Sequence, residues 1–255
     1  MKLRNLAAAV FLVSLGRDGP ALSEDAGVAL LHKMQAALGG AEKIAAIKDF
    51  EQTQSAESFD GSGNSIGDVR KRTRWIRPSS IRVDQTGPGS TYVLYFDGRS
   101  GWEVLPGTTK AVELTGGELE FARGYVRGFF LLMWLADRDS RYKLTSPEAN
   151  VVRISDGDLS HQLDFTLDPK TGLLVKETSL SLSDPAHPVT SDKVFEAWTT
   201  SDGVRFPDRF SVLRSGRRVA IAKSLDEARI NQGLKLEDLT AKPPDGKPVF
   251  RSAAK

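Results

Sequence analysis

The stretch "YFDGRSGWEV", residues 95–104, places Ser100 between two glycines and invites comparison with a hydrolase nucleophile. A nucleophile elbow reads G-x-S-x-G and lies between a strand and a helix. Here the second glycine comes one residue early, and the β-prone residues that follow it stop at Pro106. The Asp97-Gly98 pair supplies the positive φ that short hairpin turns require. We therefore expect a hairpin turn, and a serine hydrolase built around Ser100 is kept as the third alternative for function.

The residue types that bind metals and cofactors are sparse and poorly spaced. The three histidines, His32, His161 and His187, form no metal-ligand pair, and no H-E-x-x-H motif occurs. The acidic stretch "DGDLSHQLDFTLD" has His161 where a calcium loop requires glycine. No glycine-rich phosphate loop follows a predicted strand, and the chain has no cysteine. We therefore expect no metal, no cofactor and no enzymatic activity.

The densest charge cluster is the run "RKRTRWIRP", which begins at Arg70. Strand alternation sends Arg70, Arg72 and Arg74 to one face, where we expect them to be in solvent. Trp75 and Arg77 share the other face. Because a proline follows Arg77 and ends normal pairing, its guanidinium should lie at the rim of the space that Trp75 lines. There it either latches another segment through hydrogen-bond acceptors or extends to water.

Residues 1–23 are predicted to be a cleaved signal peptide. Lys2 and Arg4 precede an apolar run over 6–15, and small residues lead to a cleavage point after Ser23. The run is about half of the roughly 20 apolar residues that a membrane-spanning helix needs. Without a cysteine for lipid attachment, the mature chain is expected to be free, either periplasmic or secreted. Removal of residues 1–23 leaves 32 basic and 32 acidic residues, a balance that does not favour a nucleic-acid partner.

The remaining chain reads as a sheet with helices. Apolar residues at helical spacing predict an amphipathic helix over 25–47, interrupted by Gly39-Gly40. After residue 48, short β-prone runs alternate with turn signals, which is typical of a large antiparallel sheet whose strands pair with their sequence neighbours. Residues 117–137 carry helix formers without proline and predict one helix of about five turns. The tail over 243–255 is expected to be flexible.

The second half of the 117–137 helix is apolar on nearly every side, so it must be covered on every side. A sheet of more than about ten strands tends to curl, and larger barrels enclose a cavity. We therefore expect a mainly β fold with α, in which a curved antiparallel incomplete β-barrel of about 11 strands is covered by an N-terminal helix and a helical lid. One domain would span residues 24–242. Two interpretations stay open: a cavity that accepts an acyl chain, whose burial contributes about 0.8 kcal/mol per methylene, or an ordinary core helix in a filled domain.

Several stretches resemble the LolA family of periplasmic carriers, which move lipoproteins to the outer membrane and have LolB and the sensor RseB as relatives. The likeness lies in "FEQTQSAESFDGSGNSIGDVRKRTRWIRPSSIRVD", in "YFDGRSGWEV", in the apolar helical insert and in "LEDLTAKPPDG". The resemblance implies an incomplete β-barrel closed by helices, an apolar interior, and an arginine before a proline that latches the lid. Arg77-Pro78 matches that last feature. The part after residue 140 is longer, and "FEAWTTSDGVRFPDRFSV" is typical of LolA-like relatives whose cargo is unassigned.

The resemblance favours a periplasmic, non-enzymatic carrier or binding protein for lipids or lipoprotein acyl chains, which would act as a monomer. Its partner would be a lipid or a lipidated protein, with transient membrane-surface contact and an envelope protein partner as further expectations. The alternative is an envelope stress sensor or scaffold that uses the same fold to recognise a protein partner. The expected ligand-binding residues are Trp75, Arg77, Trp102, Phe129, Phe130, Met133 and Trp134.

Overall fold

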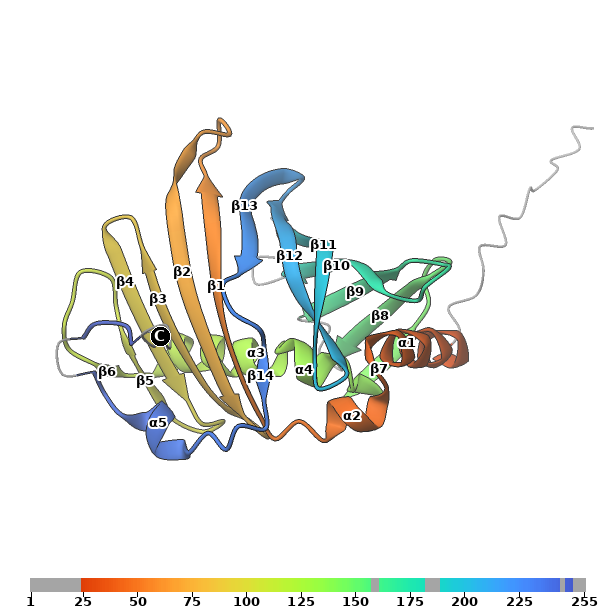
Figure 1. Ribbon diagram of the computed structural model, residues 1–255, viewed down its shortest axis with the longest axis horizontal. Coiled ribbons are helices and arrows are strands. Elements are labelled where there is room, and N and C mark those ends of the chain that lie inside the picture. The colour runs from red at the N-terminus through yellow and green to blue at the C-terminus, as the bar shows by residue number, and fades with distance from the viewer. Residues whose placement is uncertain (1–23, 157–160, 182–188, 244–245, 250–255) are drawn as a thin grey trace, which may run out of the picture.

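Short runs of alternating residues between turn-forming pairs build an antiparallel sheet, as predicted. The computed structural model describes residues 24–156, 161–181, 189–243 and 246–249, so the predicted signal peptide lies outside the described residues. Within them, fourteen strands follow the order β6-β5-β4-β3-β2-β1-β13-β12-β11-β10-β9-β8-β7, with β14 beside β1 (Figure 1). Their bounds are β1 Asp49–Phe59, β2 Ser65–Ile76, β3 Ser80–Gly87, β4 Ser90–Phe96, β5 Gly101–Val104, β6 Val112–Glu113, β7 Tyr142–Thr145, β8 Val151–Asp156, β9 His161–Leu167, β10 Leu174–Ser181, β11 Val189–Ser201, β12 Val204–Arg214, β13 Arg217–Ser224 and β14 Arg229–Ile230.

The sheet consists of two meanders that meet where β1 pairs with β13, with Ala56 opposite Ala222. Pairing between sequence neighbours alone does not produce this contact. In the described part of the chain, β6 and β7 stand at the two ends of the strand order and do not pair with each other, so the barrel is incomplete, as predicted. The strand number exceeds the prediction of about 11, and two of the strands, β6 and β14, are pairings of only two residues.

The N-terminal helices confirm the predicted helix over 25–47 and its interruption. α1 spans Glu24–Leu38 and packs against β7 and β8, and α2 spans Ala41–Ala45. Between them Gly39 has a φ of 120°, and a Cβ atom there would lie 2.1 Å from the backbone oxygen of Gly203. Only glycine combines this backbone conformation with so close an approach.

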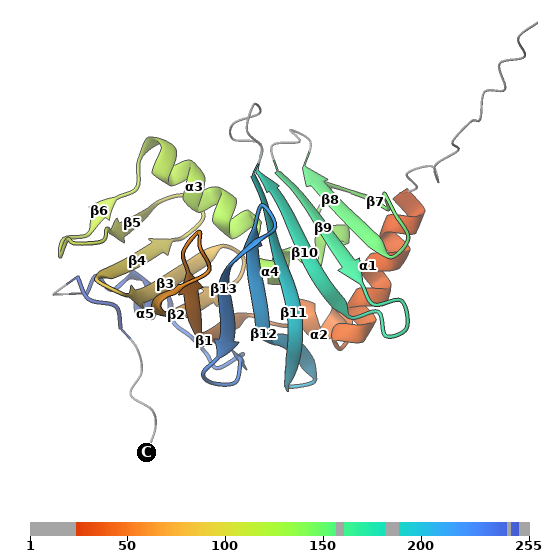
Figure 2. The ribbon, with the colours of Figure 1, turned by 90° about the horizontal axis from the view of Figure 1, so that it is seen from above.

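The helical insert connects the two ends of the sheet and crosses its inner side (Figure 2). The single helix predicted over 117–137 is wrong, because the insert is divided into α3 Gly116–Arg127, α4 Phe130–Met133 and a 3₁₀ turn at Ala136–Arg138. At the break Phe129 is extended, with φ −64° and ψ 127°. A single straight helix with apolar residues on every side would leave one side uncovered. The chain changes direction at Phe129, and both Phe129 and Phe130 contact Phe50.

Alternation along the strands of the first meander separates two apolar clusters on the two faces of the sheet. The inner face carries a cross-strand row that joins the main core, made of Phe50, Trp75, Ile81 and Phe96. The outer face carries a smaller cluster, which packs with α5 (Leu236–Thr240) and consists of Val93, Tyr95, Trp102, Val104 and Leu239. The helical insert and the cavity described below belong to the inner face.

The prediction that the three arginines at the start of the charge cluster lie in solvent is wrong for two of them. Arg72 and Arg74 are only 4% and 5% exposed, while Arg70 is exposed as expected. Each buried guanidinium has a carboxylate partner, at 3.1 Å from Arg72 to Glu51 and 2.6 Å from Arg74 to Asp84. Burial of an arginine requires such compensation, and local alternation does not reveal which segment will cover it.

The segment that covers these arginines comes from the C-terminal end of the chain. Arg74 donates a hydrogen bond of 2.9 Å to the carbonyl oxygen of Asp238, and Arg72 donates one of 2.9 Å to that of Val249. Val249 belongs to the tail over 243–255, of which residue 243 and residues 246–249 are described. The flexibility of the tail as a whole stays a prediction.

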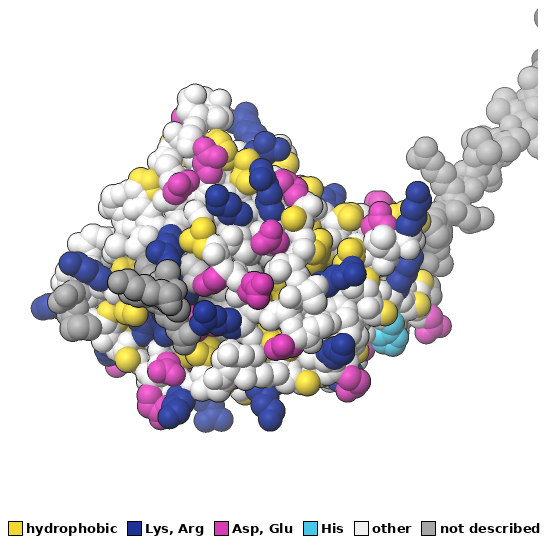
Figure 3. All heavy atoms as spheres, viewed as in Figure 1, with side chains coloured by type: hydrophobic (Ala, Val, Ile, Leu, Met, Phe, Trp, Pro, Cys, Tyr) yellow, Lys and Arg dark blue, Asp and Glu magenta, His cyan; other side chains and the backbone are white. Residues whose placement is uncertain are grey.

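The exposed surface mixes charges of both signs. Lysine and arginine side chains are interspersed with aspartate and glutamate over the face seen in Figure 3. Among the described residues, the most exposed large apolar side chains are those of Phe121 on α3 and Ile66 on β2, at 65% and 55%. None of the helices in the described ranges combines the length and apolar character needed to cross a bilayer.

Candidate functional site

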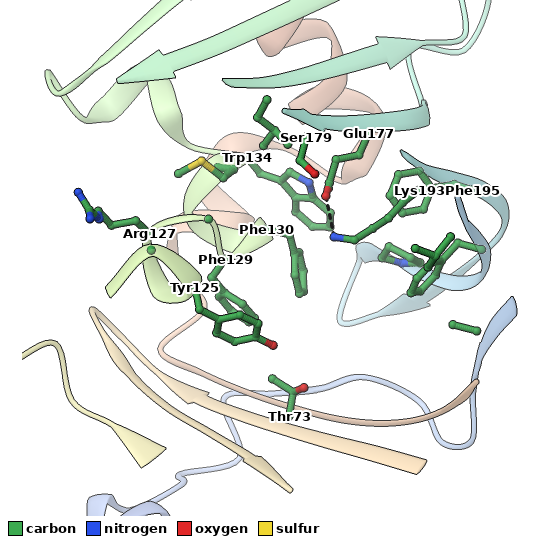
Figure 4. Close-up of a pocket in the computed structure, with 18 of the residues that line it drawn as sticks. Thr73, Tyr125, Arg127, Phe129, Phe130, Trp134, Glu177, Ser179, Lys193 and Phe195 are labelled. Carbon is green, nitrogen blue, oxygen red and sulfur yellow. Dashed lines mark hydrogen bonds and ion pairs between the residues drawn. The ribbon is translucent and has the colours of Figure 1, made fainter. Parts of the chain in front are cut away.

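A cavity of about 720 Å³ lies between the inner face of the sheet and the insert formed by α3 and α4. Both meanders contribute walls, from β1, β2 and β3 on one side to β10–β13 on the other (Figure 4). Many of the lining side chains are half-buried, so solvent reaches the cavity. Its main apolar lining residues are Phe50, Ala56, Val69, Phe129, Phe130, Met133, Trp134, Leu163, Leu180, Phe195, Phe210, Val212, Ala220 and Ala222.

Aromatic rings form the base of the cavity. The rings of Phe129 and Phe130 lie 4.7 Å apart between centroids, and Phe130 lies 4.8 Å from Trp134. Across the second meander, Phe195 and Phe210 are cross-strand partners with centroids 5.9 Å apart. Such ring pairs are stiff and bury large areas, so they hold an apolar wall in place without filling the space in front of it.

Two pairs of polar side chains also line the cavity. Lys71 of β2 donates a hydrogen bond of 2.8 Å to the phenol oxygen of Tyr125 on α3. Lys193 of β11 lies 2.6 Å from Glu177 of β10, within the cavity (Figure 4). Desolvation favours neutral lysine, but the charge and hydrogen bond of Glu177 outweigh it and raise the pKa of Lys193. Lys193 is therefore cationic at neutral pH.

The structure brings together four of the seven predicted ligand-binding residues. Phe129, Phe130, Met133 and Trp134 all line the cavity. Trp75 is fully buried and lies behind Phe129, with ring centroids 5.3 Å apart, as part of the core that supports the cavity wall.

Trp102 lies elsewhere. Its ring packs with Tyr95 on the outer face of the sheet, under Arg82, and does not line the cavity. Binding of a ligand by the seven predicted residues stays a prediction.

Sequence reasoning missed the aromatic residues of the second meander. Phe195 and Phe210 lie in strands whose alternation is interrupted by register shifts between residues 195 and 198. Alternate positions along β12 point Phe210 and Val212 to the inner face, a signal that could have identified them. Tyr125 was also missed, because it lies in the first half of the predicted 117–137 helix, and only the second half was expected to be covered on every side.

Arg77 holds the connection between α2 and β1. Its guanidinium donates hydrogen bonds of 2.9 Å and 3.3 Å to the carbonyl oxygens of Ile47 and Ile44, and it lies 5.1 Å from the ring of Trp75. Burial, together with the nearby charge of Arg138, lowers the pKa of Arg77. These contacts tie Arg77 to α2 and to the α2–β1 connection, and its role as a latch in lid movement stays a prediction.

The variant Arg77→Met is expected to lower the free energy of unfolding by about 1–3 kcal/mol, because two carbonyl groups lose a charged donor. Urea denaturation followed by circular dichroism measures this change. Arg99→Met, in the exposed turn between β4 and β5, is the matched control and should stay within about 0.5 kcal/mol of the unmodified protein. Equal effects of the two substitutions would contradict the latch.

The turn that contains Ser100 is a hairpin, as predicted. β4 pairs with β5 from Phe96 opposite Gly101, and the carboxylate of Asp97 accepts hydrogen bonds from the backbone and the hydroxyl group of Ser100. The helix that carries His32 lies at the other end of the sheet (Figures 1 and 2). The part of the chain that the structure describes contains no cluster of histidine and acidic side chains able to hold a metal ion; His187 lies outside it.

No protein-family model matches the chain. A search of the curated proteins finds no match either. Among solved structures, the chain is similar to an outer membrane lipoprotein-sorting protein domain from Vibrio parahaemolyticus, with 11% identity, a TM-score of 0.54 and coverage of 85% of this chain and 97% of that one.

Two further solved structures show the same likeness. A DUF1329 family protein from Desulfovibrio piger has 12% identity and a TM-score of 0.57, with 84% of this chain and 96% of that chain covered. A LolA superfamily protein from Nitrosomonas europaea has 14% identity and a TM-score of 0.56, with 84% and 97% covered. The open sheet, the helices on its inner side and these likenesses together show that this chain has a LolA-like fold.

Proposed function

We propose that this protein binds the acyl chains of a lipid or of a lipidated protein in the cavity between its sheet and the α3–α4 insert, and that it acts as a non-enzymatic carrier in the periplasm. The observation that carries the proposal is the cavity of about 720 Å³ with an aromatic base. Protein interiors contain few voids larger than a water molecule, so a space of this size is not a packing defect. Its volume falls in the range of small-molecule sites.

The chemistry of the walls supports an apolar ligand. Each methylene that leaves water for such a surface contributes about 0.8 kcal/mol, so a long acyl chain binds without any catalytic group. The names of the similar structures, a lipoprotein-sorting domain and a LolA superfamily protein, agree with this class of ligand. The predicted signal peptide over 1–23 supports the location outside the cytoplasm.

Native mass spectrometry of the protein secreted by its host cell tests the proposal. We expect adducts of lipid mass that disappear after extraction with organic solvent, and we expect the extracted protein to take up added hexadecanol. A protein that carries no adducts and takes up no hexadecanol would overturn the proposal. That result would favour the alternative of a sensor or scaffold that recognises a protein partner.

A further inference from the structure

Three charged side chains and one phenol from four separate elements line the cavity. Lys71 of β2, Tyr125 of α3, Glu177 of β10 and Lys193 of β11 all line it. The phenol of Tyr125 accepts a hydrogen bond of 2.8 Å from Lys71, and Lys193 lies 2.6 Å from Glu177. The two lysines therefore line one cavity, although they come from the two different meanders.

This polar cluster is not explained by stability alone. An ion pair that is partly withdrawn from water costs desolvation energy, and apolar residues of similar size would serve a packed wall without that cost. The side chain of Glu177 is 10% exposed and that of Lys193 is 44% exposed, so the pair stands between the dry base and the solvent. A ligand with both an apolar and a polar part would contact both regions.

The balance of donors and charges in the cavity favours an anion. The basic residues Lys71, Arg127, Arg141 and Lys193 line it, of which Arg141 is already paired with Asp139, against the acidic residues Asp156 and Glu177. Trp134 adds a donor: it is 1% exposed, it lines the cavity, and its indole Nε1 has no hydrogen-bond partner among the described residues. A buried N–H group without a partner is costly and uncommon in native proteins.

We propose that the bound amphiphile carries an anionic head group, a carboxylate or a phosphate, whose oxygen atoms contact Lys71 and Lys193 while its chain lies on Phe130 and the neighbouring rings. This inference rests on the function proposed above and adds the chemical class of the ligand's polar end. Glu177 competes with the head group for Lys193, since both offer carboxylate or phosphate oxygens to the same ammonium group. When the ligand binds, its head group therefore replaces Glu177 as the partner of Lys193.

Competition between ligands for the cavity tests this inference. Displacement of the neutral fluorescent probe N-phenyl-1-naphthylamine is measured with hexadecanoate, hexadecanol, lysophosphatidate and lysophosphatidylcholine, each below its micelle concentration. The unmodified protein is expected to bind hexadecanoate or lysophosphatidate at least about tenfold more tightly than the ligand without net charge. Preference for one of the two anions identifies the head group as carboxylate or phosphate.

Three variants are expected to change the preference for the anionic ligand, two of them downward and one upward. Lys193→Met and Lys71→Met should each reduce the advantage of the anionic ligand by roughly tenfold, and Glu177→Gln should increase it, because Lys193 is released. Lys223→Met, at an exposed position outside the cavity, is the matched control and should change neither affinity. Damage to the fold cannot imitate opposite signs for Lys193→Met and Glu177→Gln.

The outcomes separate the two proposals. Equal binding of hexadecanoate and hexadecanol, unchanged by the variants, would overturn the anionic head group and leave the acyl-binding function standing. Absence of probe displacement by every ligand would overturn the proposed function and this inference with it.

Discussion

The variant Asp84→Asn is expected to lower the free energy of unfolding by about 3–5 kcal/mol, because it leaves buried arginines without a countercharge. Asp84 is completely buried on the outer face of β3. Its carboxylate accepts hydrogen bonds of 2.6 Å from Arg74, of 3.0 Å and 3.1 Å from Arg82, and of 3.0 Å from the backbone of Val249. An amide in its place would turn one of these acceptors into a donor that faces arginine.

The same carboxylate should make stability depend on pH. Burial raises the pKa of Asp84, but the hydrogen bonds and charges of Arg82, Val249 and Arg74 outweigh burial and lower it below the ordinary value of 3.8. A group whose pKa is lower in the folded state stabilises the protein above its unfolded pKa and loses this contribution as the pH falls through its folded pKa. The difference in stability between the unmodified protein and Asp84→Asn should therefore shrink below pH 3.8.

Urea denaturation at pH 7 and at decreasing pH measures both effects. Asp68→Asn removes the same charge from an exposed position on β2 and should change stability by less than about 0.5 kcal/mol. If Asp84→Asn and Asp68→Asn unfold at the same urea concentration, the buried network does not hold the C-terminal segment in the way described.

The variant Ala56→Trp is expected to weaken the binding of hexadecanol at least about tenfold, because its indole ring occupies space in the cavity. Ala56 of β1 lies in the cavity wall, paired with Val69 on one side and Ala222 on the other. These small side chains leave the space above them open. Each methylene that is kept in water costs about 0.8 kcal/mol, so displacement of two or three methylenes is sufficient.

Glu57→Trp is the matched control, since the next residue of β1 is exposed and points to the other face of the sheet. Displacement of N-phenyl-1-naphthylamine gives both affinities, and urea denaturation shows whether each variant folds. A folded Ala56→Trp protein that binds hexadecanol as well as Glu57→Trp does would place the ligand outside this cavity.

Local signals in the sequence were sufficient for the elements that depend only on neighbouring residues. Asp97-Gly98 predicted the hairpin because a positive φ, found here at Gly98, depends on a single glycine and not on distant contacts. Gly39-Gly40 divided the N-terminal helices for the same reason. The aromatic residues of the insert were also identified, since a segment with so many apolar side chains has to face an apolar interior.

Contacts between distant segments were decided only by the tertiary structure. Arg72 and Arg74 are predicted to be in solvent because nothing near them in the sequence reveals the C-terminal segment, more than 150 residues away, that covers them. The helix breaks before Phe130, where the side chain contacts Phe50 of β1. Helix propensity depends only on the residues of the helix itself, so it does not predict this break.

In the candidate site, too, some features follow from the sequence and others only from the tertiary structure. The amino-acid sequence determined that this protein forms a curved β-sheet with an apolar helical insert, since alternation, turn pairs and apolar runs act over a few residues. The pairing of β1 with β13 is non-local, and it is this pairing that places Lys71 and Lys193 on two walls of one cavity. Strand partners far apart in the chain are selected by the packing of the whole sheet, so only the tertiary structure brought these two charges together.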